Sequence, residues 1–280
     1  MSQLRQDGQG VVIKACGLTM KYGSNLIQSN LNFQICKGDV FVIMGGSGCG
    51  KSTLLKHMIG LYEPAEGEIL FGGQSYFTDS PEQQLAMLKR WGVTYQGGAL
   101  FSDKTLAENV ALPLEQYTTL TSKDIRDMVR YKLALVGLAG FEDFYPSQIS
   151  GGMCKRAGLA RAIALVPDIL FFDEPSAGLD PLSARRLDDL ILQLRDSTGA
   201  TVVIVTHELA SIFAIGSNGV YLDANTKTQL DTGSPKHMLN HSKHDLVREF
   251  LSRGECADEE EYRATQKMKV NEARLSERSL

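Results

Sequence analysis

The chain has 280 residues, of which 43% are hydrophobic and 22% charged, and its formal net charge is −4 at pH 7. That is room for one large domain or two small ones with a substantial core, and the composition is ordinary for a globular protein. Proteins that bind nucleic acid are usually basic, so no nucleic-acid partner is expected, and no apolar run reaches the roughly 18 residues that span a bilayer.

The first sixty residues predict strands and one helix. Residues 1–9 are a flexible polar tail, and Val11–Ile13 opens a strand. Leu31–Ile35 alternates apolar and polar residues, as a strand with one buried face does. Val40–Met44 is wholly apolar, which favours a buried parallel strand, and a glycine-rich loop connects it to a helix pattern over Lys51–Ile59.

Residues 97–155 differ from the chain on either side. They carry apolar residues at helical spacing, at Met128, Tyr131, Leu135 and Leu138, and few strand signals. We therefore predict a mostly helical insertion between two parts of one fold.

After the insertion the pattern alternates between strand and helix. Ile169–Phe172 and Thr201–Val205 are apolar runs of strand length, and residues 182–196 between them have the spacing of an amphipathic helix. Strands that alternate with helices predict an α/β fold with a mostly parallel sheet.

The end of the chain is different again. Residues 252–280 are rich in both charge signs and hold too few apolar side chains to form a core, so they are either disordered or a helix on another surface.

The five cysteines are scattered without a Cys-x-x-Cys pair, which argues against a disulfide framework and a zinc site. The polar N-terminus lacks the apolar stretch of a signal peptide, so we expect a cytosolic protein.

The glycine-rich loop, Gly45–Ser52, fits the pattern G-x-x-x-x-G-K-[ST] at every fixed position. Glycines let the backbone curl so that successive N–H groups point at phosphate oxygens, and the following helix offers its positive N-terminus to the same charge. Lys51 adds a positive charge near the outer phosphates, and the Ser52 hydroxyl can bind Mg²⁺. The loop therefore predicts a nucleoside triphosphate site.

Two carboxylates, Asp173 and Glu174, follow the apolar run Ile169–Phe172. A buried parallel strand ends at the sheet edge where α/β folds bind ligands, so both acids are expected there. Asp173 is a candidate for holding Mg²⁺, directly or through water. Because strand side chains alternate, Glu174 is expected to point elsewhere, and it is the candidate general base for the water that attacks the γ-phosphate.

With these motifs, the segment Ile149–Met153 makes the chain resemble the ATP-binding subunits of ABC transporters over about residues 10–250. Its Ser-Gly-Gly is similar to that family's signature loop, usually Leu-Ser-Gly-Gly-Gln. In the family, this loop of one subunit covers the ATP held by the other. The resemblance thus implies a homodimer in which Ser150, Gly151 and Gly152 contact the γ-phosphate.

The resemblance also implies the fold and its division. The expected fold is α/β: a P-loop NTPase (RecA-like) core with a mostly parallel sheet, an N-terminal antiparallel β element and a helical subdomain insertion. The implied parts are a tail at 1–9, an ATPase domain at 10–251 with its core at 10–96 and 156–251 and its helical subdomain at 97–155, and a charged extension at 252–280.

Four further positions match the family. Tyr22 fits the aromatic residue that stacks on adenine, and Gln96 fits the glutamine that senses Mg²⁺ and the attacking water. Ser176–Asp180 fits the loop at the dimer seam, and His207 fits the histidine that contacts the γ-phosphate. The residues implied for catalysis are Glu174, His207, Lys51 and Gln96; for ATP binding, Tyr22, Gly45, Gly46, Ser47, Gly48, Cys49, Gly50, Lys51, Ser52, Thr53, Ser150, Gly151 and Gly152; and for Mg²⁺, Ser52, Gln96 and Asp173.

Two positions depart from the family's usual pattern. Met153 replaces the signature glutamine, which removes any polar contact that this side chain makes with the nucleotide. Cys49 lies in the phosphate loop, and a thiol at a helix N-terminus can have a lowered pKa. We therefore expect alkylating reagents to inactivate the protein and ATP to protect it.

The segment from Tyr95 to Leu114, together with Met153, is similar to the ATPases of Mla-type systems, which move phospholipids or other hydrophobic molecules across a bacterial envelope. This implies three partners: an integral-membrane permease, a cell-entry-type substrate-binding protein and a small regulatory subunit. It also implies a peripheral position on the inner face of the cell membrane.

Two alternative functions remain open: an ABC ATPase of another transporter, for amino acids, metals or lipoprotein release, and a non-transport member of the family. Leu100 and Phe101 are expected either to line a groove for a permease helix or to lie in the core of the insertion.

Overall fold

The computed structural model describes residues 10–78 and 80–253, so the predicted N-terminal tail and nearly all of the C-terminal extension lie outside the described residues. The strands are β1 (Val11–Tyr22), β2 (Asn25–Cys36), β3 (Val40–Gly45), β4 (Glu66–Phe71), β5 (Gln74–Ser75), β6 (Trp91–Thr94), β7 (Ile169–Asp173), β8 (Thr201–Val205), β9 (Asn218–Asp223) and β10 (Thr228–Thr232). The α-helices are α1 (Lys51–Met58), α2 (Pro81–Leu88), α3 (Leu106–Tyr117), α4 (Ser122–Leu135), α5 (Gly151–Ala162), α6 (Pro181–Thr198), α7 (Leu209–Ile215) and α8 (Pro235–His241).

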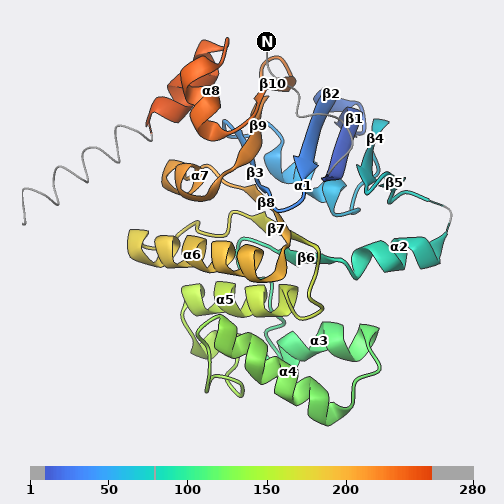
Figure 1. Cartoon of the computed structure of the whole chain (residues 1–280), viewed down its shortest axis with the longest axis vertical. Coiled ribbons are helices and arrows are strands. Elements are labelled where there is room, and N and C mark those ends of the chain that lie inside the picture. Colours follow the sequence, from blue (N-terminus) through green and yellow to red (C-terminus); the bar gives the residue numbers. More distant parts are fainter. Residues whose placement is uncertain (1–9, 79, 254–280) are drawn as a thin grey trace, which may run out of the picture.

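The strands form two sheets (Figure 1). One is antiparallel, in the order β2-β1-β4-β5, and the other has the order β10-β9-β3-β8-β7-β6. In the second sheet only the pair β10 and β9 is antiparallel. The predicted α/β class, with a mostly parallel sheet and an N-terminal antiparallel element, is confirmed.

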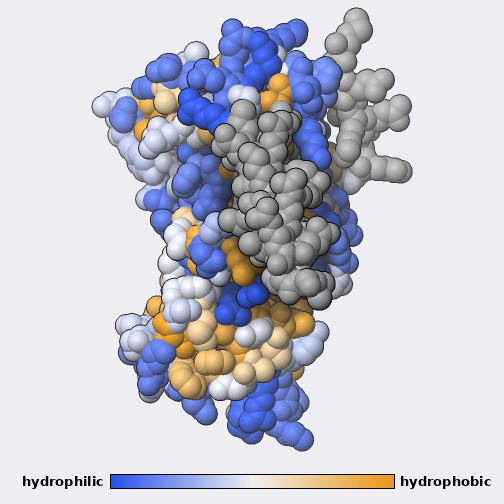
Figure 2. Space-filling view, turned by 90° about the vertical axis from the view of Figure 1, so that its left-hand side faces the viewer, coloured by the Kyte–Doolittle hydropathy of each residue, from blue (hydrophilic) through white to orange (hydrophobic). Residues whose placement is uncertain are grey.

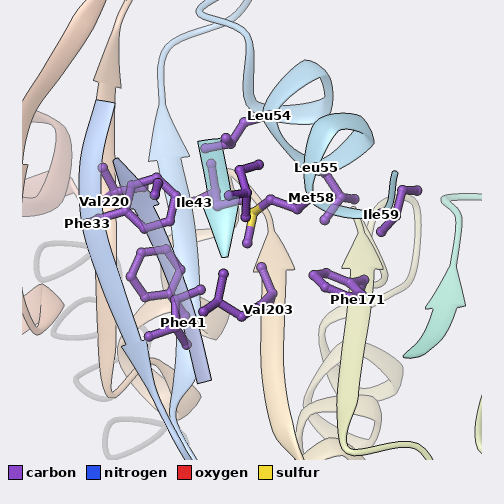
Figure 3. Close-up of a cluster of buried hydrophobic side chains, with 14 of the residues drawn as sticks. Phe33, Phe41, Ile43, Leu54, Leu55, Met58, Ile59, Phe171, Val203 and Val220 are labelled. Atoms are coloured by element: carbon purple, nitrogen blue, oxygen red, sulfur yellow. The ribbon is translucent and has the colours of Figure 1, made fainter. Parts of the chain in front are cut away.

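The central parallel strands are apolar throughout because both of their faces are covered. Phe41 on β3, Phe171 on β7 and Val203 on β8 belong to the core between the parallel sheet, α1 and the antiparallel sheet (Figure 3). The alternate residues Phe172 and Ile204 belong to a second core, which α3, α4, α5 and α6 share with the other face of the sheet. This packing explains why these strands show no polar alternation in the sequence.

The predicted helical insertion contains α3 and α4, and α5 crosses the predicted boundary at residue 155. The division into domains therefore stays a prediction. The helical spacing is confirmed by α4, but not all of its apolar residues are buried: Leu138 just beyond the helix is 0% exposed, whereas Tyr131 is 57% and Leu135 is 39% exposed. The helix buries Val129 and Leu133, because α4 carries apolar side chains on two faces and only one of them meets α3 and α5.

Apolar side chains also reach the surface of this helical part. Figure 2 shows them gathered low on one side of the molecule, at the level of α4 and α5 in Figure 1. Leu100 is partly buried against the core, whereas Phe101 is 52% exposed. An exposed apolar surface of this kind is typical of a contact with another protein. In the described part of the chain, none of the helices has the length and apolar composition of a membrane span.

Candidate nucleotide site

Three neighbouring strands end at one edge of the parallel sheet and bring the predicted motifs together. The phosphate loop follows β3, the two carboxylates stand at the end of β7, and His207 follows β8. The register pairs Ile43 of β3 with Val205 of β8, and Val205 with Asp173 of β7. The carboxyl ends of parallel strands are the usual ligand-binding edge of such a sheet.

The phosphate loop needs glycine at Gly45 and Gly50. Their φ angles are 143° and 100°, which side chains rarely adopt, and a Cβ on Gly45 would lie 2.3 Å from the carbonyl oxygen of Leu222. Between them, Gly46, Ser47 and Gly48 are exposed to solvent. The loop therefore forms an open turn in front of the N-terminus of α1, as an anion site requires.

Lys51 is folded over this loop. Its Nζ donates hydrogen bonds of 2.9 Å to the carbonyl oxygens of Gly45 and Gly46. The ammonium group is thus held at the mouth of the turn, where a phosphate oxygen could replace a carbonyl oxygen as its partner.

Ser52 and Asp173 come from different elements and meet directly. The Ser52 hydroxyl donates a hydrogen bond of 3.0 Å to Asp173 Oδ1. Burial raises the pKa of Asp173, and the bond from Ser52 partly offsets this rise. A hydroxyl and a carboxylate, both oxygen donors, form the kind of ligand pair that suits Mg²⁺.

Glu174 does not continue the strand as predicted. Its φ is 49°, in the left-handed region, while its N–H donates to the Val205 carbonyl at 2.9 Å. The strand therefore stops at Asp173, and the turn rather than strand alternation directs the Glu174 side chain. Glu174 Oε1 lies 2.9 Å from Nδ1 of His207, and Glu174 Oε2 is buried without a hydrogen-bond partner among the described residues.

The adenine-side candidates also lie near the loop. The Tyr22 hydroxyl is 3.5 Å from the Thr53 hydroxyl, and the Tyr22 ring meets the edge of Tyr62 at 5.6 Å between centroids. Tyr22 is 43% exposed, so its ring is accessible to a planar base.

Gln96 and the signature loop are not joined to these groups. Gln96 is exposed, and in the described ranges its side chain makes no hydrogen bond to Ser52 or Asp173. Ser150 caps α5 by accepting from the N–H of Met153 at 3.3 Å, and Gly151 is exposed beside it. Within the described residues, no hydrogen bond connects this helix start with the phosphate loop.

Gln28, which sequence reasoning missed, supports the loop from behind. It is fully buried, and its Nε2 donates to the carbonyl oxygens of Cys49 at 2.6 Å and Asp223 at 2.9 Å. No sequence signal marks it, because a glutamine in an alternating strand is expected to face solvent.

A model of the ABC transporter family matches residues 28–177, which is more than half of the chain. The chain belongs to the ABC transporter family. As an ABC ATPase subunit it binds ATP and hydrolyses it to ADP and phosphate, in agreement with the phosphate loop and carboxylates described above.

Relatives of this ABC ATPase include transport proteins of several bacteria. It is 40% identical to the probable ribonucleotide transport ATP-binding protein mkl of Mycobacterium leprae, over 90% of this chain and 73% of that one. It is 43% identical to the intermembrane phospholipid transport system ATP-binding protein MlaF of Haemophilus influenzae, over 81% of this chain and 86% of that one.

Solved ABC cassettes share the fold. The structure of cbiO1 from Clostridium perfringens has a TM-score of 0.75 at 26% identity and covers 83% of this chain and 92% of that one. The dimeric structure of MJ0796, a bacterial ABC transporter cassette, has a TM-score of 0.72 at 28% identity and covers 79% of this chain and 98% of that one. The same cassette in a post-hydrolysis state with ADP and phosphate has a TM-score of 0.69.

The expectation of an acidic thiol in the phosphate loop of this ABC ATPase is wrong. Cys49 is only 1% exposed, and burial raises its pKa, which the charge of Lys51 only partly offsets. Desolvation of the thiolate outweighs the helix N-terminus because the sulfur points into the core beneath the loop.

We predict that N-ethylmaleimide at pH 7 modifies Cys49 more slowly than Cys16 or Cys36, which are partly exposed. Peptide mapping by mass spectrometry over a time course measures the rates, and Cys49→Ser provides the peptide control. Labelling of Cys49 ahead of Cys36 would contradict the burial argument.

Proposed function

We propose that this ABC ATPase powers the transport of phospholipid, or of another hydrophobic molecule, across a bacterial envelope through a separate permease. The observation that carries the proposal is the 43% identity to the Haemophilus influenzae protein named for intermembrane phospholipid transport. The mkl relative, which is named for ribonucleotide transport, supports the role as a transport ATPase but with a different transported molecule.

In the proposed mechanism, Glu174 is the general base. Its carboxylate accepts the proton of the attacking water, while the contact of 2.9 Å between Oε1 and Nδ1 of His207 keeps the carboxylate in place. His207 is itself 63% exposed at the side chain, so it can also reach the γ-phosphate. Lys51 and the N–H groups from Gly46 to Thr53 stabilise the phosphate charge, and Tyr22 stacks on adenine.

Mg²⁺ is the proposed metal of this site, with Ser52 and Asp173 as its ligands. Their oxygen atoms fit its preference, and they already lie within hydrogen-bond distance of each other. When bound, the ion would neutralise charge on the phosphate oxygens. Gln96 lies two residues beyond the end of β6, which pairs with β7, so its backbone lies near the same sheet edge and a turn of the loop could direct its side chain there.

The signature loop is proposed to act on the ATP of a second copy. Ser150, Gly151 and Gly152 stand at the exposed start of α5, whose N–H groups and positive helix end suit a γ-phosphate. The dimeric arrangement of the MJ0796 cassette supports this pairing. ATP would then be part of the interface, so that binding closes the dimer and hydrolysis opens it.

The permease is proposed to dock at the exposed loop that carries Phe101. Asn109, fully buried, fixes this loop: its Oδ1 accepts from the N–H of Phe101 at 2.8 Å, and its Nδ2 donates to the carbonyls of Phe101, Lys104 and Thr105. Docking there would hold the chain at the inner face of the membrane. A cell-entry-type binding protein and a small regulatory subunit complete the proposed assembly.

We predict that the Glu174→Gln chain, with Mg-ATP, copurifies from detergent-solubilised membranes of its host with a permease, a cell-entry-type protein and bound phospholipid. Mass spectrometry of proteins and lipids is the measurement, and Lys51→Ala, which should not hold the ATP-closed state, is the matched control. Recovery of a permease for a different substrate would support the role as a transport ATPase and refute the proposal of lipid transport. Recovery with soluble partners only would refute the transport role.

A further inference from the structure

Asp188 is a buried acid that the proposed mechanism does not use. It lies on α6 and is only 6% exposed. The space beside it is lined mainly by apolar groups, from Val42 on β3, Ile204 on β8 and Ile215 at the end of α7. A carboxylate in such surroundings loses its hydration, and this costs free energy unless a hydrogen-bond partner compensates for it. A buried acid that is kept despite this cost is a candidate for a functional role.

Its one hydrogen-bond partner in the described ranges is Ser211 on α7. The Ser211 hydroxyl donates to Asp188 Oδ2 at 2.7 Å. The two charged groups that act on Asp188 are Glu208, at the start of α7, and Asp189, its exposed neighbour on α6; both are acidic. Burial, more than these charges, raises the pKa of Asp188 to about 6.

The bond joins two helices that begin at the catalytic loops. Helix α6 follows the turn that runs from Glu174 to Asp180, and α7 follows the short segment from Thr206 to Glu208 that carries His207. Pro175, Ser176 and Thr206 line the same small space as Asp188. The link between Asp188 and Ser211 therefore lies beside Pro175 and Thr206, which are the chain neighbours of Glu174 and His207.

This acid opposes folding at neutral pH. Because its pKa rises from 3.8 in the unfolded chain to about 6 in the fold, the stability contributed by its protonated form is complete below pH 3.8 and lost as the pH rises through about 6. A neutral residue of the same shape would make the fold more stable above that pH. Residues that lower stability in this way are typical of functional sites.

We propose that Asp188 is a positioning residue for ATP hydrolysis, whose charged carboxylate, through its bond with Ser211, holds the His207 segment against the Glu174 turn. The inference rests on the proposed roles of Glu174 and His207. The charged form is the active one because a hydrogen bond to a carboxylate is stronger than one to a neutral acid. When Asp188 ionises, its negative charge also repels that of Glu208 at the start of α7, so this repulsion changes over the same pH range.

The decisive experiment compares Asp188→Asn with the parent chain in full-length protein. Asparagine keeps the shape and the acceptor for Ser211 but not the charge, so it resembles the protonated acid at every pH. We expect its kcat at pH 7.5 to fall about fivefold, the difference between a charged and a neutral hydrogen bond, with the KM for ATP unchanged. The ratio of the parent kcat to the variant kcat should approach one as the pH falls through about 6.

The thermal midpoint distinguishes positioning from a merely structural role. Asp188→Asn should melt at a higher temperature than the parent chain above pH 6, and the difference should shrink towards pH 4. Ser211→Ala should lower kcat at pH 7.5 to a similar extent, and the double variant should lose little more, because both changes remove one link. The control is Asp189→Asn, the same change on the exposed neighbour.

The outcomes separate this inference from the site on which it rests. A kcat ratio that does not change with pH, or a variant that is both less stable and less active, would overturn the role of Asp188. Glu174→Gln is assayed in the same series. If that variant keeps normal turnover, the proposed site fails; if it is inactive while Asp188→Asn matches the parent at every pH, only the inference about Asp188 fails.

Discussion

Glu174→Gln should bind ATP with near-parental affinity and hydrolyse it about 10²- to 10⁴-fold more slowly, the usual contribution of a general base. Glutamine preserves the shape of the side chain and its contact with His207, but it cannot take a proton from water. The side chain therefore loses its negative charge and its basicity, while the position beside His207 stays filled. Phosphate release measures turnover, and calorimetric titration of ATP measures affinity.

The matched control for this variant is Glu68→Gln, an exposed acid on β4 that undergoes the same change of charge. It should retain parental turnover. A Glu174→Gln chain that hydrolyses ATP at the parental rate would show that another group activates the water.

The Lys51→Ala variant should be impaired in ATP binding, the step that precedes hydrolysis. We expect the affinity for ATP to fall about 10- to 100-fold, because hydrogen bonds to charged groups contribute about 1.5–3 kcal/mol. The change removes the charge at the mouth of the phosphate loop and frees the carbonyls of Gly45 and Gly46 from their bonds with Nζ. The measurement is again calorimetric, with Mg-ATP and with ADP.

Lys37→Ala, in the turn that precedes β3, is the control for Lys51→Ala. It removes the same charge at the opposite end of the strand from the phosphate loop. Unchanged affinity in Lys51→Ala, or an equal loss in Lys37→Ala, would mean that net charge and not the loop lysine governs nucleotide binding.

The centre of the fold was predictable because its pattern is local. An apolar run, a glycine-rich turn and a helix start specify β3, the phosphate loop and α1 without reference to the rest of the chain. Asp173 was predictable for the same reason, since a buried strand that ends in an acid places that acid at the ligand edge. Its contact with Ser52, which is distant in sequence, follows from the order of the sheet, because β3 and β7 lie on either side of β8 and end at the same edge.

The parts that the sequence could not specify depend on contacts that no local pattern encodes. The direction of Glu174 is set by a left-handed turn, and that of Cys49 by the core beneath the loop. The support from Gln28 and the link from Asp188 to Ser211 join strands and helices distant in the chain. Strand alternation places Gln28 on the surface, and helical spacing places Asp188 on the apolar face of α6 without indicating its partner. Only the assembled fold shows what these buried polar groups contact.

The left-handed backbone at Glu174 has a consequence for laboratory evolution. With φ at 49°, a residue with a side chain costs the fold about 1–2 kcal/mol there, and glycine relieves that cost. A library screened for heat resistance alone would therefore enrich glycine at position 174 and return thermostable proteins without the carboxylate that we propose as the general base. Screens for a robust version of this motor should hold that codon constant or score turnover alongside survival.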